Sequence, residues 1–173
     1  GETLPFRLPV CGRHFLANAL AAVAVARSLG LSLAEISEGL AHNVLLPKRR
    51  QQWLRAPGGF LILDDAYNSS PASVRAALEV IREAPVQGRR IAVLGDIKEL
   101  GQRSEQLHEE VGGELGNSHI DLVVCVGDYA GSIAAGAQRS GLSDECVAVC
   151  SDNEEATAAV REWVAAGDLV LVK

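Results

Sequence analysis

Acidic residues stand where apolar runs of this sequence end, and their side chains are the best suited to do chemistry. They follow separate runs along the chain: Asp64, Asp65, Asp96, Glu99, Asp128 and Asp152. If the runs are parallel strands of one sheet, their carboxyl ends meet at one edge, where such sheets bind ligands. A carboxylate there can hold a ribose diol, or it can cap the helix that follows. We favour helix caps for Asp128 and Asp152 and a binding function for Asp64 and Asp65.

The turn after Asp64 and Asp65 is more polar than one helix cap requires. The segment AYNSSP (66–71) supplies several hydrogen-bonding side chains before Pro71 begins a helix. An acidic pair followed by such a turn suits a ribose diol, as in dinucleotide sites. A second charged loop, GDIKELG (95–101), is either a solvated turn or part of the same site.

Several other kinds of site lack their sequence motifs here. Neither the GxGxxG fingerprint nor the GxxxxGK[ST] phosphate loop occurs. No Cys/His cluster has zinc spacing, so no metal site is expected. We interpret His14 and His108, which lie on predicted helices, as packed or surface residues. The four cysteines form no CxxC pair, and we expect buried free thiols.

Short apolar runs alternate with amphipathic segments after Gly59, and this alternation would position the acidic residues. The runs predict strands near 60–64, 90–94, 122–126, 146–150 and 168–172, and helices over 71–84, 104–116, 130–141 and 152–167. The runs are apolar on both faces, as parallel strands covered by helices must be. We therefore predict an α/β domain with a parallel five-stranded sheet and flanking helices.

Residues 12–46 have a different, helical pattern. The segment HFLANALAAVAVARSLG (14–30) is apolar on all sides, which predicts a largely buried helix that ends at Gly30. Ser32 and Glu35 form a capping box for a second helix that runs to about Ala41. The basic segment 47–57 is interpreted as a loop or an edge strand between the two patterns.

Composition narrows the classes of protein that fit. Hydrophobic residues make up 48% of the 173 residues, and no apolar run approaches the ~20 residues of a membrane span. A net charge of −6 disfavours nucleic acid as a main partner. The sequence has no methionine and begins with glycine, so we expect it to be part of a longer protein.

Several segments, taken together and in order, resemble the Mur ligase family. They are GRH (12–14) with NALAA (18–22), LDDAYNSSPASVRAAL (63–78), LGDIKELG (94–101), His108 with VG (111–112), and LVLVK (169–173). Their combination resembles the branch that adds D-alanyl-D-alanine to UDP-N-acetylmuramoyl-tripeptide. The resemblance implies that residues 1–58 are a helical remnant of the central ATP-binding domain. Residues 59–173 would be the Rossmann-like C-terminal domain, truncated at its end.

The resemblance also implies a reaction, an ATP-dependent amide ligation of peptidoglycan precursor synthesis in the bacterial cytoplasm. ATP would phosphorylate the tripeptide carboxylate, and the dipeptide amine would attack the acyl phosphate while Mg²⁺ offsets the charge. The phosphates and the metal would be held mainly by an upstream region of the parent. We therefore expect the 173-residue chain alone to be inactive.

Carried over residue by residue, the resemblance assigns the adenosine side of ATP to this chain. Asn18 would bond the adenine, and Arg49 would approach the nucleotide from the turn that the family writes as PGR. The remaining residues would meet the ribose or flank the base: Asp64 or Asp65, Tyr67 and Asn68. The loop with Asp96 and Glu99 would face the substrate, and the acidic edge suits the ammonium of D-alanyl-D-alanine. Phe15 and Lys48 depart from the family pattern, which has asparagine and glycine there.

Two other classes of function stay open at this point. One is a non-catalytic α/β nucleotide-binding module, which would bind its ligand without turnover. The other is a scaffold domain in which the acidic residues only cap helices.

Overall fold

The sequence forms two compact units, and the division falls between Pro47 and Lys48. The computed structural model describes residues 3–42 and 47–173. The sequence placed the boundary at 58/59, but strand β1 (Gln52–Arg55) pairs with strand β2 (Leu61–Asp64) and so belongs to the sheet of the second unit.

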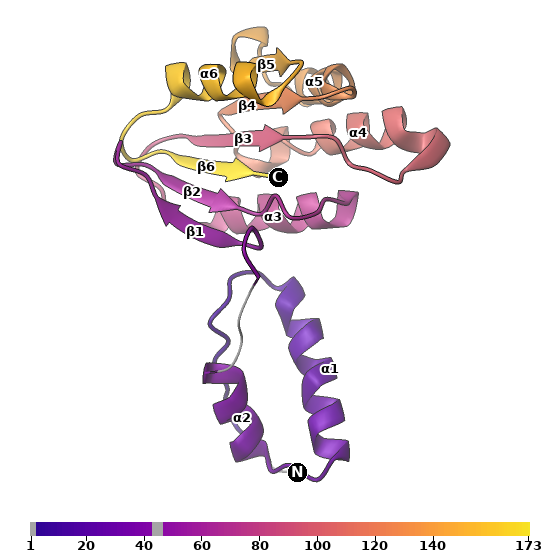
Figure 1. Cartoon of the computed structure of the whole chain (residues 1–173), viewed down its shortest axis with the longest axis vertical. Coiled ribbons are helices and arrows are strands. Elements are labelled where there is room, and N and C mark those ends of the chain that lie inside the picture. The colour runs from indigo at the N-terminus through magenta and orange to yellow at the C-terminus, as the bar shows by residue number, and fades with distance from the viewer. Residues whose placement is uncertain (1–2, 43–46) are drawn as a thin grey trace. The chain divides into compact units, whose positions relative to one another are not determined.

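The second unit is built on a six-stranded sheet with the order β1-β2-β6-β3-β4-β5 (Figure 1). Its remaining strands are β3 (Arg90–Leu94), β4 (Leu122–Val126), β5 (Val147–Cys150) and β6 (Leu169–Val172). Strands β2 to β6 are parallel, so the five predicted parallel strands are confirmed. Strand β1 adds an antiparallel edge, and all four of its residues are exposed.

Helices cover both faces of this sheet, which is why its strands are apolar on both sides. They are α3 (Pro71–Glu83), α4 (Ser104–Gly113), α5 (Ala130–Arg139) and α6 (Asn153–Trp163), and 3₁₀ turns lie at Gly101–Arg103, Gly116–Ser118 and Asp144–Cys146. On one face α3, α4 and α5 pack against a core that includes Leu63, Val123 and Leu171. On the other face α6 packs on residues such as Val124 and Cys150.

Helices α4 and α5 pack with their backbones in contact. A Cβ added at Gly112 would collide with the carbonyl oxygen of Ile133, and one added at Gly136 would collide with that of Glu109. Only glycine permits this approach at these two positions. The contact fixes the position of α4, and α4 in turn borders the loop that follows β3.

Strand β6 lies between β2 and β3, because the chain returns from β5 through α6 to the position between them. Asp64 of β2 pairs with Val172 of β6, and Val172 pairs in turn with Val93 of β3. Open α/β sheets bind ligands outside the carboxyl ends of such parallel strands. The segments after β2, β6 and β3 therefore meet at one edge of the sheet.

The first unit contains helices α1 (His14–Ser28) and α2 (Leu33–His42). The predicted capping box is present: the Ser32 N–H donates to Glu35 Oε2 (2.8 Å), and the Glu35 N–H donates to Ser32 Oγ (3.3 Å). The prediction that α1 is largely buried is wrong for this structure, since Ala19 is its one buried residue and Leu20 is 61% exposed. An all-apolar helix needs cover on every side, and the short α2 covers too little of it.

Candidate functional site

An open cleft of about 580 Å³ lies at the carboxyl ends of the five parallel strands. Its walls come from the segments that follow each strand: Ala66–Ser69 after β2, Gly95, Asp96 and Lys98 after β3, Gly127 after β4, Ser151–Asn153 after β5, and Lys173 after β6. This is the edge at which the sequence placed the acidic residues. The structure thus brings the turn 66–71 and the loop 95–101 to one cavity.

A buried ion pair joins the carboxyl ends of β2 and β6, which are neighbours in the sheet. Lys173 Nζ lies 2.6 Å from Asp65 Oδ2, and it also donates to the carbonyl oxygens of Asp65 (3.3 Å) and Asn68 (2.9 Å). The two side chains are 3% and 13% exposed. Asp65 Oδ1 accepts the Gln51 N–H (3.0 Å). These partners tie the turn after β2 to the end of β6, so the Asp65 carboxylate holds the wall of the cleft.

Asp64 has a different environment from its neighbour. Its Oδ1 accepts the N–H of Ala66 (3.2 Å), which forms a local turn at the end of β2. The side chain is partly exposed, and no ion pair engages it among the described residues. Of the two acidic residues, Asp64 therefore keeps more of its hydrogen-bonding capacity for a ligand.

Tyr67 lies on the outer wall of the cleft and is 61% exposed. The Arg50 guanidinium lies over its ring, 4.3 Å from the centroid, a cation–π geometry. The Tyr67 N–H donates to the carbonyl oxygen of Arg49 (3.0 Å), whose backbone has a φ of 60°. The structure thus brings the main chain of Arg49 to Tyr67 and Asn68, while Arg50 is the basic side chain stacked on the ring. Sequence reasoning missed Arg50.

Asp96 begins the loop after β3 and is tied to the turn between β4 and α5. Its carboxylate accepts the N–H groups of Tyr129 (3.0 Å) and Asp128 (3.2 Å), and Lys98 Nζ lies 3.0 Å away. Burial raises the pKa of Asp96, but the hydrogen bonds from Tyr129, Lys98 and Asp128 outweigh it and the pKa is lowered. A Cβ at Gly127 would lie 2.7 Å from this carboxylate, so the approach requires glycine.

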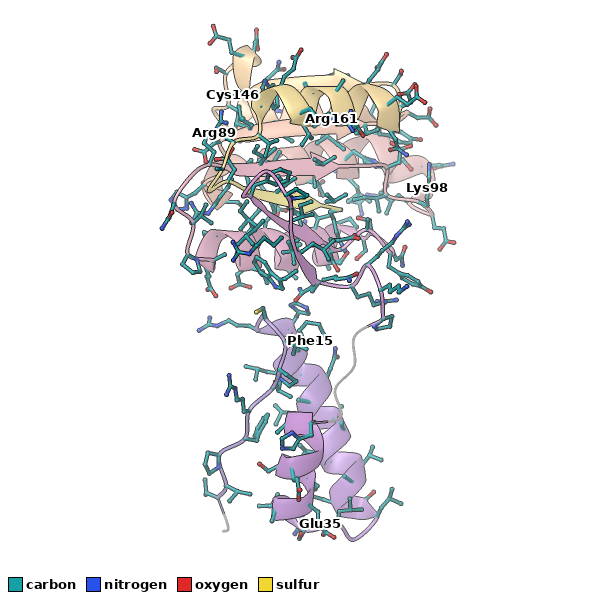
Figure 2. The ribbon with its side chains drawn as sticks, turned by 60° about the vertical axis from the view of Figure 1, so that its left-hand side comes forward. Phe15, Glu35, Arg89, Lys98, Cys146 and Arg161 are labelled. Atoms are coloured by element: carbon teal, nitrogen blue, oxygen red, sulfur yellow. The ribbon has the colours of Figure 1, made fainter. Side chains whose placement is uncertain are left out.

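Lys98 and Glu99 follow in the same loop. The Lys98 side chain is 75% exposed and projects beyond the end of the sheet, at the opposite end of β3 from Arg89 (Figure 2). Its hydrogen bond and ion pair with Asp96 raise the pKa of Lys98. Glu99 is exposed with a φ of 65°, and it is not among the described residues that line the cleft.

The two predicted helix caps had different outcomes. Asp152 caps α6, since its Oδ1 accepts the N–H groups of Glu154 and Glu155, both at 2.9 Å. The prediction for Asp128 is wrong because its side chain makes no cap to α5, and Asp96 accepts the N–H groups of Asp128 and Tyr129, the two residues before this helix. The partner comes from the neighbouring strand, which local sequence does not reveal.

The remaining candidates are not among the described residues that line the cleft. Asn18 is exposed on α1 of the first unit. Cys125 and Cys150 are buried free thiols as predicted, and burial raises the pKa of Cys125 to about 12. Cys11 is exposed, so the expectation of a buried thiol is wrong there.

Two kinds of feature are absent from residues 3–42 and 47–173. No group of three or more His, Cys, Asp or Glu side chains could hold a metal ion. No helix in these ranges is long and apolar enough to cross a membrane.

Lys173 is a second residue of the site that sequence reasoning did not single out as a ligand or positioning group. A lysine that ends the apolar run LVLV is a signal in itself, because a charged side chain at the end of a buried strand needs a partner. Its partner Asp65 lies far away in sequence and becomes a neighbour only through the β2–β6 pairing.

Comparison with known proteins gives the family that the sequence motifs resemble. The family model for the Mur ligase, glutamate ligase domain matches residues 49–173. The chain is 32% identical to the UDP-N-acetylmuramoyl-tripeptide--D-alanyl-D-alanine ligase of Bacillus subtilis over 97% of this chain and 36% of that protein.

Two solved structures extend the comparison to three dimensions. A crystal structure of MurF from Acinetobacter baumannii has a TM-score of 0.80 at 30% identity, covering 96% of this chain and 35% of that one. MurF ligase from Thermotoga maritima, solved in complex with ADP, has a TM-score of 0.75 at 31% identity over 94% and 35%. The chain thus spans about a third of the length of the proteins it matches. Its sheet, its segments at the strand ends and these matches agree, and the chain belongs to the Mur ligase family.

Proposed function

We propose that this chain is part of an ATP-dependent ligase that adds D-alanyl-D-alanine to UDP-N-acetylmuramoyl-tripeptide during peptidoglycan precursor synthesis in the bacterial cytoplasm. The observation that carries the proposal is the convergence of the turn 66–71 and the loop 95–101 on one cleft in a chain of this family. The names of its relatives give the substrates. Residues 1–47 would be the end of the central ATP-binding domain, and residues 48–173 the C-terminal domain.

The exposed apolar surface of α1 supports this division of the parent protein. Leu16, Leu20, Val25 and Leu29 are between 49% and 74% exposed. A helix that is apolar on all sides belongs to the core of a larger domain. Further parts of a central domain would cover these side chains.

On the nucleotide side, the chain would contribute contacts to the adenosine of ATP. Asn18 would bond the adenine, Tyr67 and Asn68 would flank the base, and Arg49 would approach the nucleotide. Of the acidic pair, Asp64 would accept the ribose hydroxyls, since Lys173 and the Gln51 N–H already engage Asp65. Asp65 would then position the turn rather than touch the sugar.

On the substrate side, the loop with Asp96 and Glu99 would face the incoming dipeptide. Asp96 and Asp152 line the cleft together with Lys98 and Lys173, and the two carboxylates offer acceptors for an ammonium group. The lowered pKa of Asp96 keeps its carboxylate ionised at neutral pH. The amine, once deprotonated, would attack the acyl phosphate formed from ATP and the tripeptide.

Mg²⁺ would stabilise the charge on the reacting phosphates in such a ligase. The described residues of this chain offer no cluster of three ligands for it. Its ligands and the phosphate loop would therefore belong to other parts of the parent, and the 173-residue chain alone would not ligate.

The full-length parent protein tests the proposal. Incubation with ATP, Mg²⁺, UDP-N-acetylmuramoyl-tripeptide and D-alanyl-D-alanine should yield the amide product by mass spectrometry, with one ADP released per product. Each omission of a substrate should abolish both signals. Nucleotide binding without product under complete conditions would instead identify a non-catalytic module.

A further inference from the structure

The loop after β3 carries three residues of the cleft wall, Gly95, Asp96 and Lys98, and its backbone is strained at the next residue. Glu99 has a φ of 65°, a backbone conformation that side chains with a Cβ rarely adopt. Such a conformation persists only where surrounding contacts determine it. Contacts from outside the loop must therefore hold it at the cleft.

His108 of α4 supplies one of these contacts. Its side chain is completely buried, and its Nε2 lies 2.8 Å from the Ile97 N–H at the centre of the loop. Its Nδ1 lies 2.6 Å from the Ser104 carbonyl oxygen. A backbone N–H can only donate and a carbonyl can only accept, so the network assigns the neutral ring with its proton on Nδ1. Of the two alternatives that the sequence left open for His108, a packed or a surface residue, the structure shows the packed one, and one of its two partners lies in the cleft loop.

A second contact joins the same parts of the molecule. The Tyr129 ring stacks on His108, with centroids 4.5 Å apart and an interplanar angle of 10°. The Tyr129 N–H donates to Asp96. The loop is thus held at Asp96 by the β4–α5 turn and at Ile97 by α4, and Tyr129 and His108 connect the two attachments.

We propose that His108 is a positioning residue of the cleft. Its Nε2 fixes the backbone of Ile97, and this places Asp96 and Lys98, its sequence neighbours, at the cleft wall. His108 lines no part of the cleft itself, so it acts through the loop. The effect on ligation rests on the proposed function, whereas the effect on the loop does not.

Two substitutions separate the acceptor at Nε2 from the rest of the ring. In His108→Asn the side-chain amide can donate to Ser104 in place of Nδ1 but is too short to reach Ile97. In His108→Gln the longer side chain can present an oxygen near the position of Nε2. Both variants lose the ring and its stacking on Tyr129, and they differ in the hydrogen bond that remains: the bond to Ser104 in His108→Asn and the bond to Ile97 in His108→Gln.

Amide hydrogen exchange in the 173-residue chain tests the loop directly. The exchange rate of the Ile97 amide is compared with the rates of the β4 amides, which report global unfolding. This relative rate should be about tenfold higher in His108→Asn than in His108→Gln, because a buried N–H that loses its acceptor is destabilised by about that factor. Equal relative rates in the two variants would overturn the proposal.

Kinetics of the full-length protein test the consequence for the site. His108→Asn should raise the KM for D-alanyl-D-alanine about tenfold over His108→Gln while the melting temperatures stay similar. A purely structural histidine would lower the amount of active enzyme in both variants without separating their KM values, and that result would also overturn the proposal. If the unsubstituted protein does not ligate, the proposed function fails while the exchange experiment still decides the role of His108.

Discussion

Replacing Asp65 with alanine should destabilise the α/β unit far more than the same change at Asp64. Asp65→Ala leaves the Lys173 ammonium, 3% exposed, with only two carbonyl partners, and it removes the acceptor of the Gln51 N–H. Breaking a buried ion pair at one partner costs about 3–5 kcal/mol, and the remaining carbonyls reduce this to about 2–4 kcal/mol. Asp64→Ala removes one local hydrogen bond to Ala66 and should cost less than about 1 kcal/mol.

Tryptophan fluorescence is a suitable assay because both tryptophans, Trp53 and Trp163, lie in this unit. At about 3 °C per kcal/mol for a domain of this size, Asp65→Ala should lower the melting temperature by about 6–12 °C and Asp64→Ala by less than about 3 °C. Adding Lys173→Met to Asp65→Ala should restore part of the loss, since no buried charge then lacks a counterion. Equal destabilisation by the two alanine variants would refute the reasoning.

Three further outcomes follow from the same geometry. Gly127→Ala should destabilise the unit by about 1–3 kcal/mol in urea unfolding, because φ is +108° and a Cβ would meet Asp96, whereas Gly131→Ala, which meets nothing within 4 Å, should be neutral or slightly stabilising. Burial raises the pKa of Asp168, but hydrogen bonds from Arg89 and Ala165 lower it overall, and the pKa of Asp96 is also lowered. The stability that both carboxylates contribute is present above pH 3.8 and is lost as pH falls below that value. The urea midpoint of unfolding should therefore drop below pH 3.8, and it should drop less in Asp168→Asn. The purified 173-residue chain should release no phosphate from ATP in the presence of D-alanyl-D-alanine, and measurable dipeptide-dependent release would contradict the assignment of the phosphates to other parts of the parent.

The parallel strands could be predicted because the central ones, β3, β4 and β6, are largely buried on both faces, which leaves a continuous apolar run such as LVVCV in β4. Strand β1 could be predicted only as a loop or an edge strand, since its residues QWLR are all exposed. Its strand conformation depends on the pairing with β2, which the local sequence does not reveal. Burial of α1 was predicted from its apolar composition, but composition does not reveal what covers a helix.

At the site, the sequence located the cleft but not the role of each acidic residue. Asp65 and Lys173 are neighbours only because β6 inserts beside β2, and Asp96 accepts the N–H groups of the turn before α5 only because β3 lies beside β4. These partnerships depend on strand order, which local pattern does not specify. Asp152, whose partners lie within three residues of it, was predicted correctly.

The most direct test of the account is the dependence of ligation on ATP concentration in the full-length protein, measured for Asn18→Ala and Asp64→Asn beside the unsubstituted enzyme. Adenosine does not change between the ground state and the transition state, so lost contacts to it should raise KM for ATP at nearly constant kcat. A neutral hydrogen bond of about 0.5–1.5 kcal/mol predicts a rise of up to about tenfold for Asn18→Ala. Asp64→Asn should raise KM for ATP by a comparable factor, with the melting temperature unchanged. A melting temperature that falls while KM for ATP stays constant would contradict the assignment of these residues to the nucleotide.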